Sequence, residues 1–249
     1  MTVKKKKRKV RKELRIMAFI IVGLILLIGG LVTYQLLSEH KGNGSVHVIV
    51  LDNAHGGDAS GVQGLISEDE YNEKLIDALA KQFEGKSDYR IVRTHEDGQA
   101  MAVSTRVGVI NDADADLVLS VRCHNAGSPN FNNTKIFAQP ATMKYHGDSA
   151  AFAGLIRDAM EKQGVECQAG YYYYKPIKQG YYQEHLVVLE DETDYGEETW
   201  ELMGADAPVV IVSQFDANDE AAVELWGSEE GIATAAKLYY RAITAMFDK

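Results

Sequence analysis

Hydrophobic positions along the chain fall into two alternating kinds of segment. Short, largely β-branched apolar runs predict strands at 46–51, 89–93, 115–121, 134–138, 186–189 and 208–212. Apolar residues at helical spacing predict helices at 68–83, 100–111, 149–163 and 229–247. Because strands and helices alternate, the pattern favours an α/β single domain with a mixed, largely parallel sheet flanked by helices.

The N-terminal segment has a different pattern. Its first sixteen residues carry nine Lys or Arg side chains and one acid, Glu13, and residues 17–37 follow with 21 uncharged positions. At ~1.5 Å per residue, such a helix covers the roughly 30 Å hydrocarbon core of a bilayer. A cationic flank favours the cytoplasmic side. We therefore expect a basic cytoplasmic tail (1–16), one transmembrane helix (17–37), a linker (38–45) and an extracytoplasmic domain (46–249).

Two other interpretations of this apolar segment are weaker. A cleaved signal peptide usually has a shorter apolar stretch, and residues 36–40 contain no small-x-small cleavage pattern. A buried helix of a soluble protein does not agree with residues 20–28, which are apolar all round and follow a cationic block. We expect a retained anchor, which localises the chain to the cell membrane.

Charge and cysteine content exclude some classes of protein. The tail contains nine of the 26 basic and one of the 36 acidic side chains. Residues 17–249 therefore carry 17 basic and 35 acidic side chains, a formal charge of −18. A nucleic-acid partner is therefore not expected. The two cysteines, Cys123 and Cys167, exclude a disulfide-rich secreted scaffold but do not reveal their redox state.

Three expected strand ends carry polar side chains, and ligands of open α/β sheets bind at the carboxyl ends of strands. These side chains are His55, Arg122 with His124, and Ser213. His55 precedes two glycines, and Glu68 begins the next predicted helix. A histidine and a carboxylate brought together in this way are half of a zinc site. Taken singly, His55 also fits a loop histidine with one hydrogen bond, and Glu68 fits a first-turn helix acid.

Several spaced motifs recur in a fixed order along the predicted domain. They are Asp52 to Gly57 with Asp58 and Gly61, Glu68 to Asn72, Thr94 to Asp97, Arg106 to Asn111, Ala115 to Ser120, and Phe215 to Asn218. In this order they resemble the zinc-dependent N-acetylmuramoyl-L-alanine amidase family of bacterial cell-wall hydrolases, from about His47 to the C-terminus. Any one motif alone would be weak evidence, but together they are specific.

The resemblance implies a function and two metal ligands. By this likeness His55 is the first zinc ligand and Glu68 the second, with Zn²⁺ as the cofactor. The implied reaction is hydrolysis of the amide between the lactyl group and the stem peptide of peptidoglycan. The implied partners are peptidoglycan glycan-peptide strands, with other cell-envelope proteins as a further class.

Two departures from the family pattern affect this chemistry. Arg122 occupies the ungapped position of the third ligand, a histidine. Since residues 122 and 124 face the same side of a strand, a one-pleat slip would offer His124 to the metal. Otherwise the permanent cation of Arg122 would repel zinc and pair with Glu68. Ser213 occupies the position of the catalytic glutamate, and serine cannot accept a proton from zinc-bound water near neutral pH.

Further polar and aromatic residues have two interpretations each. The carboxylates of Glu190, Glu192 and Asp216 could replace the missing glutamate, but we interpret them as solvated surface residues. The tyrosines at 171–174 and 181–182 predict a hairpin. Its aromatic face would either stack on sugar rings or stabilise an insert by cross-strand pairing.

The sequence therefore predicts a membrane-anchored, peptidoglycan-directed domain that is degenerate, with no catalytic residue assigned. It would act in cell-wall binding or remodelling, either without catalysis or with weak activity. One alternative is an active amidase that uses His55, Glu68 and His124 for zinc. Another is a protein-protein scaffold at the membrane.

Overall fold

The computed structural model describes residues 46–125, 134–139, 143–178, 181–188 and 202–248. The predicted tail, transmembrane helix and linker lie outside these residues. None of the helices within the described ranges is both long and apolar enough to cross a membrane. Residues 47–249 form one compact unit.

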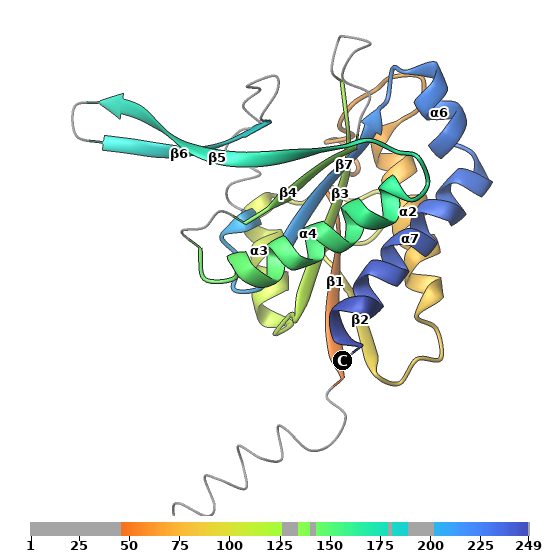
Figure 1. The fold of residues 1–249 in the computed structure, drawn as a ribbon, viewed down its shortest axis with the longest axis horizontal. Helices are drawn as coiled ribbons and strands as arrows, with labels where there is room; N and C mark the ends of the chain where they lie inside the picture. The colour runs from red at the N-terminus through yellow and green to blue at the C-terminus, as the bar shows by residue number, and fades with distance from the viewer. Residues whose placement is uncertain (1–45, 126–133, 140–142, 179–180, 189–201, 249) are drawn as a thin grey trace, which may run out of the picture. The chain divides into compact units, whose positions relative to one another are not determined.

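Seven strands form one mixed sheet (Figure 1). In the order of the sheet they are β2 (Tyr89–Arg93), β1 (His47–Asn53), β3 (Leu117–His124), β7 (Val209–Asp216), β4 (Thr134–Ala138), β5 (Cys167–Lys178) and β6 (Tyr181–Val188). The β2–β1, β1–β3, β3–β7 and β4–β5 pairs are parallel. The β7–β4 and β5–β6 pairs are antiparallel. The predicted mixed sheet is confirmed.

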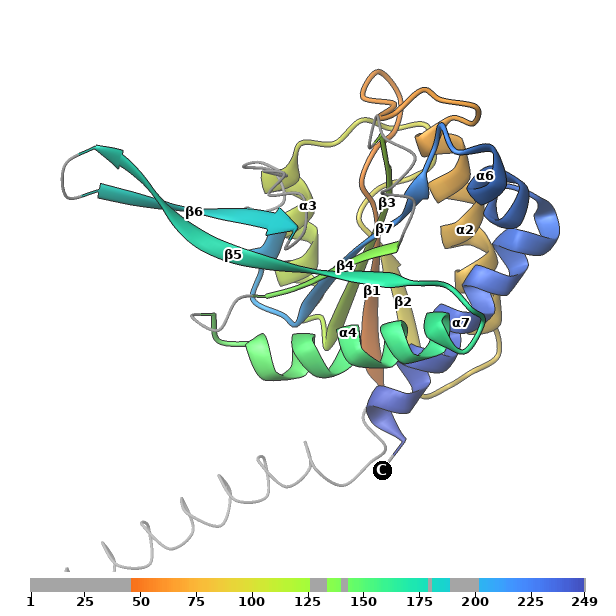
Figure 2. The same cartoon turned by 45° about the horizontal axis from the view of Figure 1, so that its top comes forward.

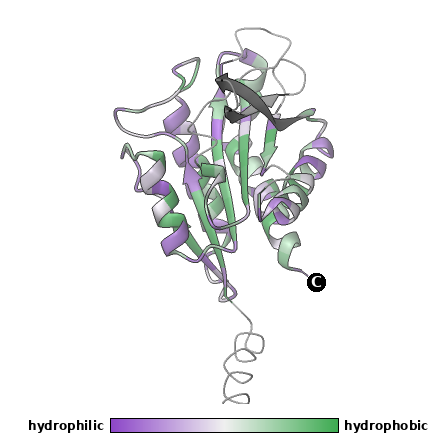
Figure 3. Cartoon of the chain, turned by 90° about the vertical axis from the view of Figure 1, so that its left-hand side faces the viewer, coloured by the Kyte–Doolittle hydropathy of each residue, from purple (hydrophilic) through white to green (hydrophobic). Residues whose placement is uncertain are grey.

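Helices cover both faces of this sheet. They are α2 (Glu68–Gln82), α3 (Val103–Asp112), α4 (His146–Glu161), α6 (Glu220–Trp226) and α7 (Glu229–Phe247). Alternation along β1 sends Ile49 and Leu51 into the core beneath α2, α4, α6 and α7, and sends Val48 and Val50 into a second core beneath α3. Figure 3 shows the resulting hydrophobic strands between helices that also carry hydrophilic positions.

The parallel strands bring their carboxyl ends to one edge of the sheet. The loop that follows β1, orange in Figure 2, lies at the top of that view, beside the ends of β3 and β7. Asn53, His124 and Asp216 are the last residues of these three strands. This edge is where an open α/β sheet offers its ligand site.

The predicted tyrosine hairpin is confirmed as a pair of strands. β5 and β6 pair antiparallel, with Tyr172 opposite Leu186 and Tyr174 opposite Glu184. Figure 1 shows this hairpin projecting well beyond the helices that cover the sheet. Whether its tyrosines stack on sugars stays a prediction, because the side chains of both strands lie outside the described part of the molecule.

Candidate functional site

The loop after β1 brings His55 against Glu68, the first residue of α2. His55 Nε2 lies 3.7 Å from Glu68 Oε1. Gly61 closes this loop with a φ of +69°, and a Cβ there would overlap Glu68 Oε2 and approach His55 Cδ2 to 2.7 Å. A left-handed backbone and the close approach both require glycine here. The two residues that the sequence pairs as metal ligands are therefore adjacent.

The carboxylate of Glu68 is held on both oxygens. Oε1 accepts a hydrogen bond from the Cys123 backbone N–H at 2.7 Å, and Oε2 accepts one from the Val62 backbone N–H at 2.7 Å. The side chain is 1% exposed. On the other side of the pair, His55 Nδ1 lies 3.2 Å from the Ala59 carbonyl oxygen, which leaves Nε2 facing Glu68. Both rotamers are thus fixed by backbone groups.

The ends of β3 and β7 bring His124 to Ser213. His124 Nδ1 lies 2.8 Å from Ser213 Oγ, and both side chains are buried. In the parallel ladder Arg122 is opposite Ser213, and a register shift then places His124 opposite Asp216. We call His55, Glu68, His124 and Ser213 the edge cluster.

Asp216 differs from its predicted surface role. Its side chain is 4% exposed, because it ends β7 inside the edge of the sheet, where Oδ1 accepts a hydrogen bond from the Asn218 backbone N–H at 2.9 Å. The surface interpretation of Asp216 is therefore wrong. The other two carboxylates considered there, Glu190 and Glu192, lie outside the described residues.

A zinc site of this family type needs three protein ligands around an open position. Within the described ranges, no three His, Cys, Asp or Glu side chains form a group that could hold a metal ion. Glu68 is engaged by two backbone N–H groups, and His124 faces a serine hydroxyl. As arranged, these side chains do not fit a three-ligand zinc centre. The assignment of His55, Glu68 and His124 as ligands stays a prediction. The predicted Arg122–Glu68 ion pair is not formed among the described residues, because the Glu68 carboxylate contacts the Val62 and Cys123 backbone N–H groups and His55 instead.

A second group of polar residues lies buried at the same end of β1. Asp52 accepts hydrogen bonds from Thr94 Oγ1 at 2.7 Å, from Ser120 Oγ at 2.6 Å, and from Arg106 Nη1 at 3.0 and 2.8 Å to its two oxygens. We call these four residues the framework cluster. Burial raises the pKa of Asp52, but the Arg106 cation and the hydroxyl hydrogen bonds outweigh burial and hold that pKa below its ordinary value.

The sequence analysis quoted the framework residues only as parts of motifs and missed their mutual contact. One signal was present in the pattern. Arg106 shares a helix face with Val103 and Ile110, both buried, so a cation interrupts an apolar stripe. A buried arginine needs an anionic partner, and Asp52 at a strand end was the available one.

The two cysteines are free thiols in this structure. Cys123 is in β3 and Cys167 begins β5, three strand spacings away in the sheet order, or about 14 Å at ~4.8 Å per spacing. This separation is too large for a disulfide. Burial, with smaller contributions from Glu68 and Asp216, raises the pKa of Cys123 well above its ordinary value. Without a bound metal, this thiol is therefore protonated near neutral pH.

Comparisons with known proteins agree with this fold. Residues 49–245 match a family model described as N-acetylmuramoyl-L-alanine amidase. AmiC2 of Nostoc punctiforme is a solved structure with a TM-score of 0.63 and 16% identity, covering 83% of this chain and 100% of that one. A search of curated proteins gives no match.

Two further structures are similar over the same region. The catalytic domain of CwlV from Bacillus (Paenibacillus) polymyxa var. colistinus has a TM-score of 0.61 and 18% identity, covering 81% of this chain and 98% of that one. CwlD from Clostridioides difficile, solved in complex with the GerS lipoprotein, has a TM-score of 0.62 and 16% identity over 81% and 98%. At these identities the structures show a shared fold.

Proposed function

Since the chain belongs to the N-acetylmuramoyl-L-alanine amidase family, we propose that it is a peptidoglycan-directed domain that has lost amide hydrolysis and is held at the membrane by residues 17–37. Its task would be binding or remodelling of the cell wall rather than cutting. The family membership supports the substrate class, and the edge cluster supports the loss of chemistry.

The observation that carries the proposal is the position and burial of Ser213. It stands where the family resemblance places the catalytic glutamate, it is fully buried, and its hydroxyl contacts His124. A hydroxyl cannot act as a base near neutral pH. Loss of a general acid/base alone typically lowers the rate by ~10² to 10⁴.

The residues at the predicted zinc-ligand positions also support a loss of hydrolysis. His55 and Glu68 would be two of the ligands of a family-type zinc ion, which when bound supplies an activated water. The ungapped third position is Arg122, whose charge is permanent and repels a cation. We infer that the chain binds zinc weakly.

A binding role needs only the retained fold and its surface. Residues 49–245 match the family model, and within them the β5–β6 hairpin forms a projecting arm. Cell-envelope proteins are a second class of partner for such a domain. The similar CwlD structure, which contains a lipoprotein, supports this class by analogy.

The function is tested with the full chain, purified in detergent and mixed with purified peptidoglycan. We expect the chain to sediment with the polymer while no new peptide amino termini appear. A chain that stays in the supernatant would contradict the binding role. Release of stem peptides by the unmodified chain, abolished in a Glu68→Gln variant, would contradict the loss of hydrolysis.

The anchor is tested separately in intact cells stripped of wall. Added protease should digest the domain and leave the basic tail protected, because the cationic flank stays in the cytoplasm. A soluble extracellular fragment that starts near residue 45 in untreated cells would show cleavage instead.

A further inference from the structure

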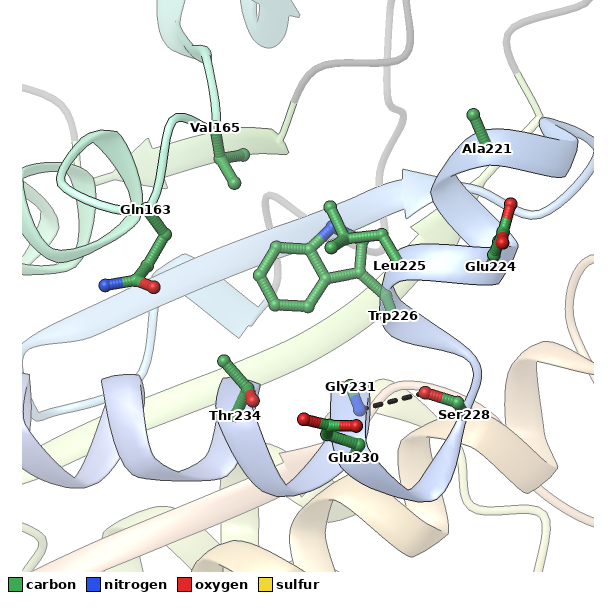
Figure 4. A pocket seen from close by; sticks show the side chains of 10 residues that line it. All are labelled: Gln163, Val165, Ala221, Glu224, Leu225, Trp226, Ser228, Glu230, Gly231 and Thr234. Carbon is green, nitrogen blue, oxygen red and sulfur yellow. Dashed lines mark hydrogen bonds between the residues drawn. The ribbon is translucent and has the colours of Figure 1, made fainter.

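A groove of about 480 Å³ lies between the corner that joins α6 to α7 and the segment after α4 (Figure 4). Trp226 and Leu225 come from α6, Glu230 from the first turn of α7, and Val165 from the segment after α4. The volume is in the range of pockets that bind ligands. Its lining comes from residues other than those of the edge cluster.

The walls of this groove are fixed before any ligand arrives. A Cβ on Gly231 would overlap the Leu225 carbonyl oxygen and lie 2.8 Å from the Trp226 carbonyl carbon, so the two helices meet with backbone in contact. Ser228 Oγ accepts a hydrogen bond from the Gly231 N–H at 3.0 Å, drawn as a dashed line in Figure 4. Trp226 itself is 3% exposed. A preformed groove reduces the ordering cost of binding.

The chemistry of the groove is apolar and acidic. Leu225 is 55% exposed at its rim, beside the Trp226 indole (Figure 4). Glu224 and Glu230 are exposed and carry the charge. Among the lining residues, which all belong to the described chain, none is a lysine or an arginine. The two glutamates would repel an anionic ligand. They would attract a cation, while the leucine and tryptophan side chains would contact an apolar group next to it.

We propose that this groove binds a cationic segment of a partner protein. The segment inserts an apolar side chain against Leu225 and Trp226 and places Lys or Arg side chains beside Glu224 and Glu230. A second copy of the domain is a poor occupant, because residues 17–249 carry a formal charge of −18. The chain's own basic tail is on the other side of the membrane in the proposed topology.

The probe is a short fluorescein-labelled peptide of alternating lysine and leucine, titrated with the full chain in detergent at low salt. We expect saturable binding, followed by anisotropy. The double variant Glu224→Gln with Glu230→Gln should weaken it about threefold to tenfold, as for two exposed charge pairs. Leu225→Ser should weaken it independently of salt concentration.

A matched control separates the groove from general surface charge. Glu220→Gln with Glu229→Gln changes the same charge on the same two helices, at positions outside the groove lining. We expect less than about a twofold change in binding for this variant. A lysine-serine peptide of equal charge should bind more weakly than the lysine-leucine peptide.

Several results would overturn the proposal. They are equal losses in the two double variants, equal binding of the serine peptide, and absence of saturable binding. A rise in probe affinity when the lysines of residues 4–7 are replaced by glutamine would also overturn it, because the chain's own tail would then be the occupant. Only the exclusion of the chain's own tail rests on the topology of the proposed function. None of these outcomes depends on peptidoglycan binding or hydrolysis, so failure of the inference is distinguishable from failure of the proposed function.

Discussion

Two polar clusters share the carboxyl edge of one sheet, and they differ in what their residues are arranged to do. In the framework cluster, a buried carboxylate receives hydrogen bonds from two hydroxyls and an arginine, so its charge is paired. In the edge cluster, two predicted ligands are adjacent, but the positions expected to complete a metal site and to move a proton carry Arg122 and Ser213. In the proposed function, the scaffold of the site is retained while its chemistry is lost.

The difference teaches that fold and reaction depend on separate residues here. The framework cluster joins β1, β3 and α3 through charge pairing inside the protein, where an unpaired charge is costly. In the edge cluster, Glu68 is held by two backbone N–H groups, and His124 contacts Ser213. Changes in the first should therefore affect stability, and changes in the second should affect ligand binding.

The largest expected effect comes from Asp52→Asn. It leaves the Arg106 cation buried without its anion, and breaking such a pair costs about 3–5 kcal/mol of unfolding free energy. Urea unfolding measures the loss. Arg157→Gln is the control, because the ion pairs of Arg157 with Asp158 and Glu161 are exposed, so the variant should leave the midpoint almost unchanged. Equal stabilities of the two variants would refute the framework role.

A smaller effect is expected from Gly61→Ala, which probes the loop of the edge cluster. The new methyl group meets Glu68 and His55, and the left-handed backbone adds strain, so we expect a loss of about 2–4 kcal/mol. Gly98→Ala is the matched control, because Gly98 has a φ of +70° and open space around its Cβ position. It should lose only the backbone part, about 1–2 kcal/mol. Equal losses would show that the loop does not close on Glu68.

A still smaller effect should appear in the pH dependence of stability. The folded-state pKa of Asp52 is lowered from its ordinary value of 3.8, so its contribution is fully present above that value and is lost as pH falls through the folded pKa. The stability difference between the unmodified chain and Asp52→Asn should therefore shrink as the solution is acidified below about pH 4. A constant difference across this range would contradict the lowered pKa.

The fold was predictable because its central strands are continuous apolar runs, such as β7, which is buried at every position. α6 was missed, since seven residues are too few for a helical period to show. In the site, the adjacency of His55 and Glu68 followed from family spacing. The burial of Asp216 did not, because it depends on the register shift between β3 and β7, which no local pattern encodes.

The central claim is that the edge cluster no longer assembles a zinc enzyme, and the zinc content of the purified full chain tests it most directly. We predict far less than one zinc per chain in the unmodified protein. The double variant Arg122→His with Ser213→Glu should gain zinc, because it restores the family's ligand and its carboxylate. Stoichiometric, tightly held zinc in the unmodified chain, lost on His124→Ala, would contradict the account and establish a site built from His55, Glu68 and His124.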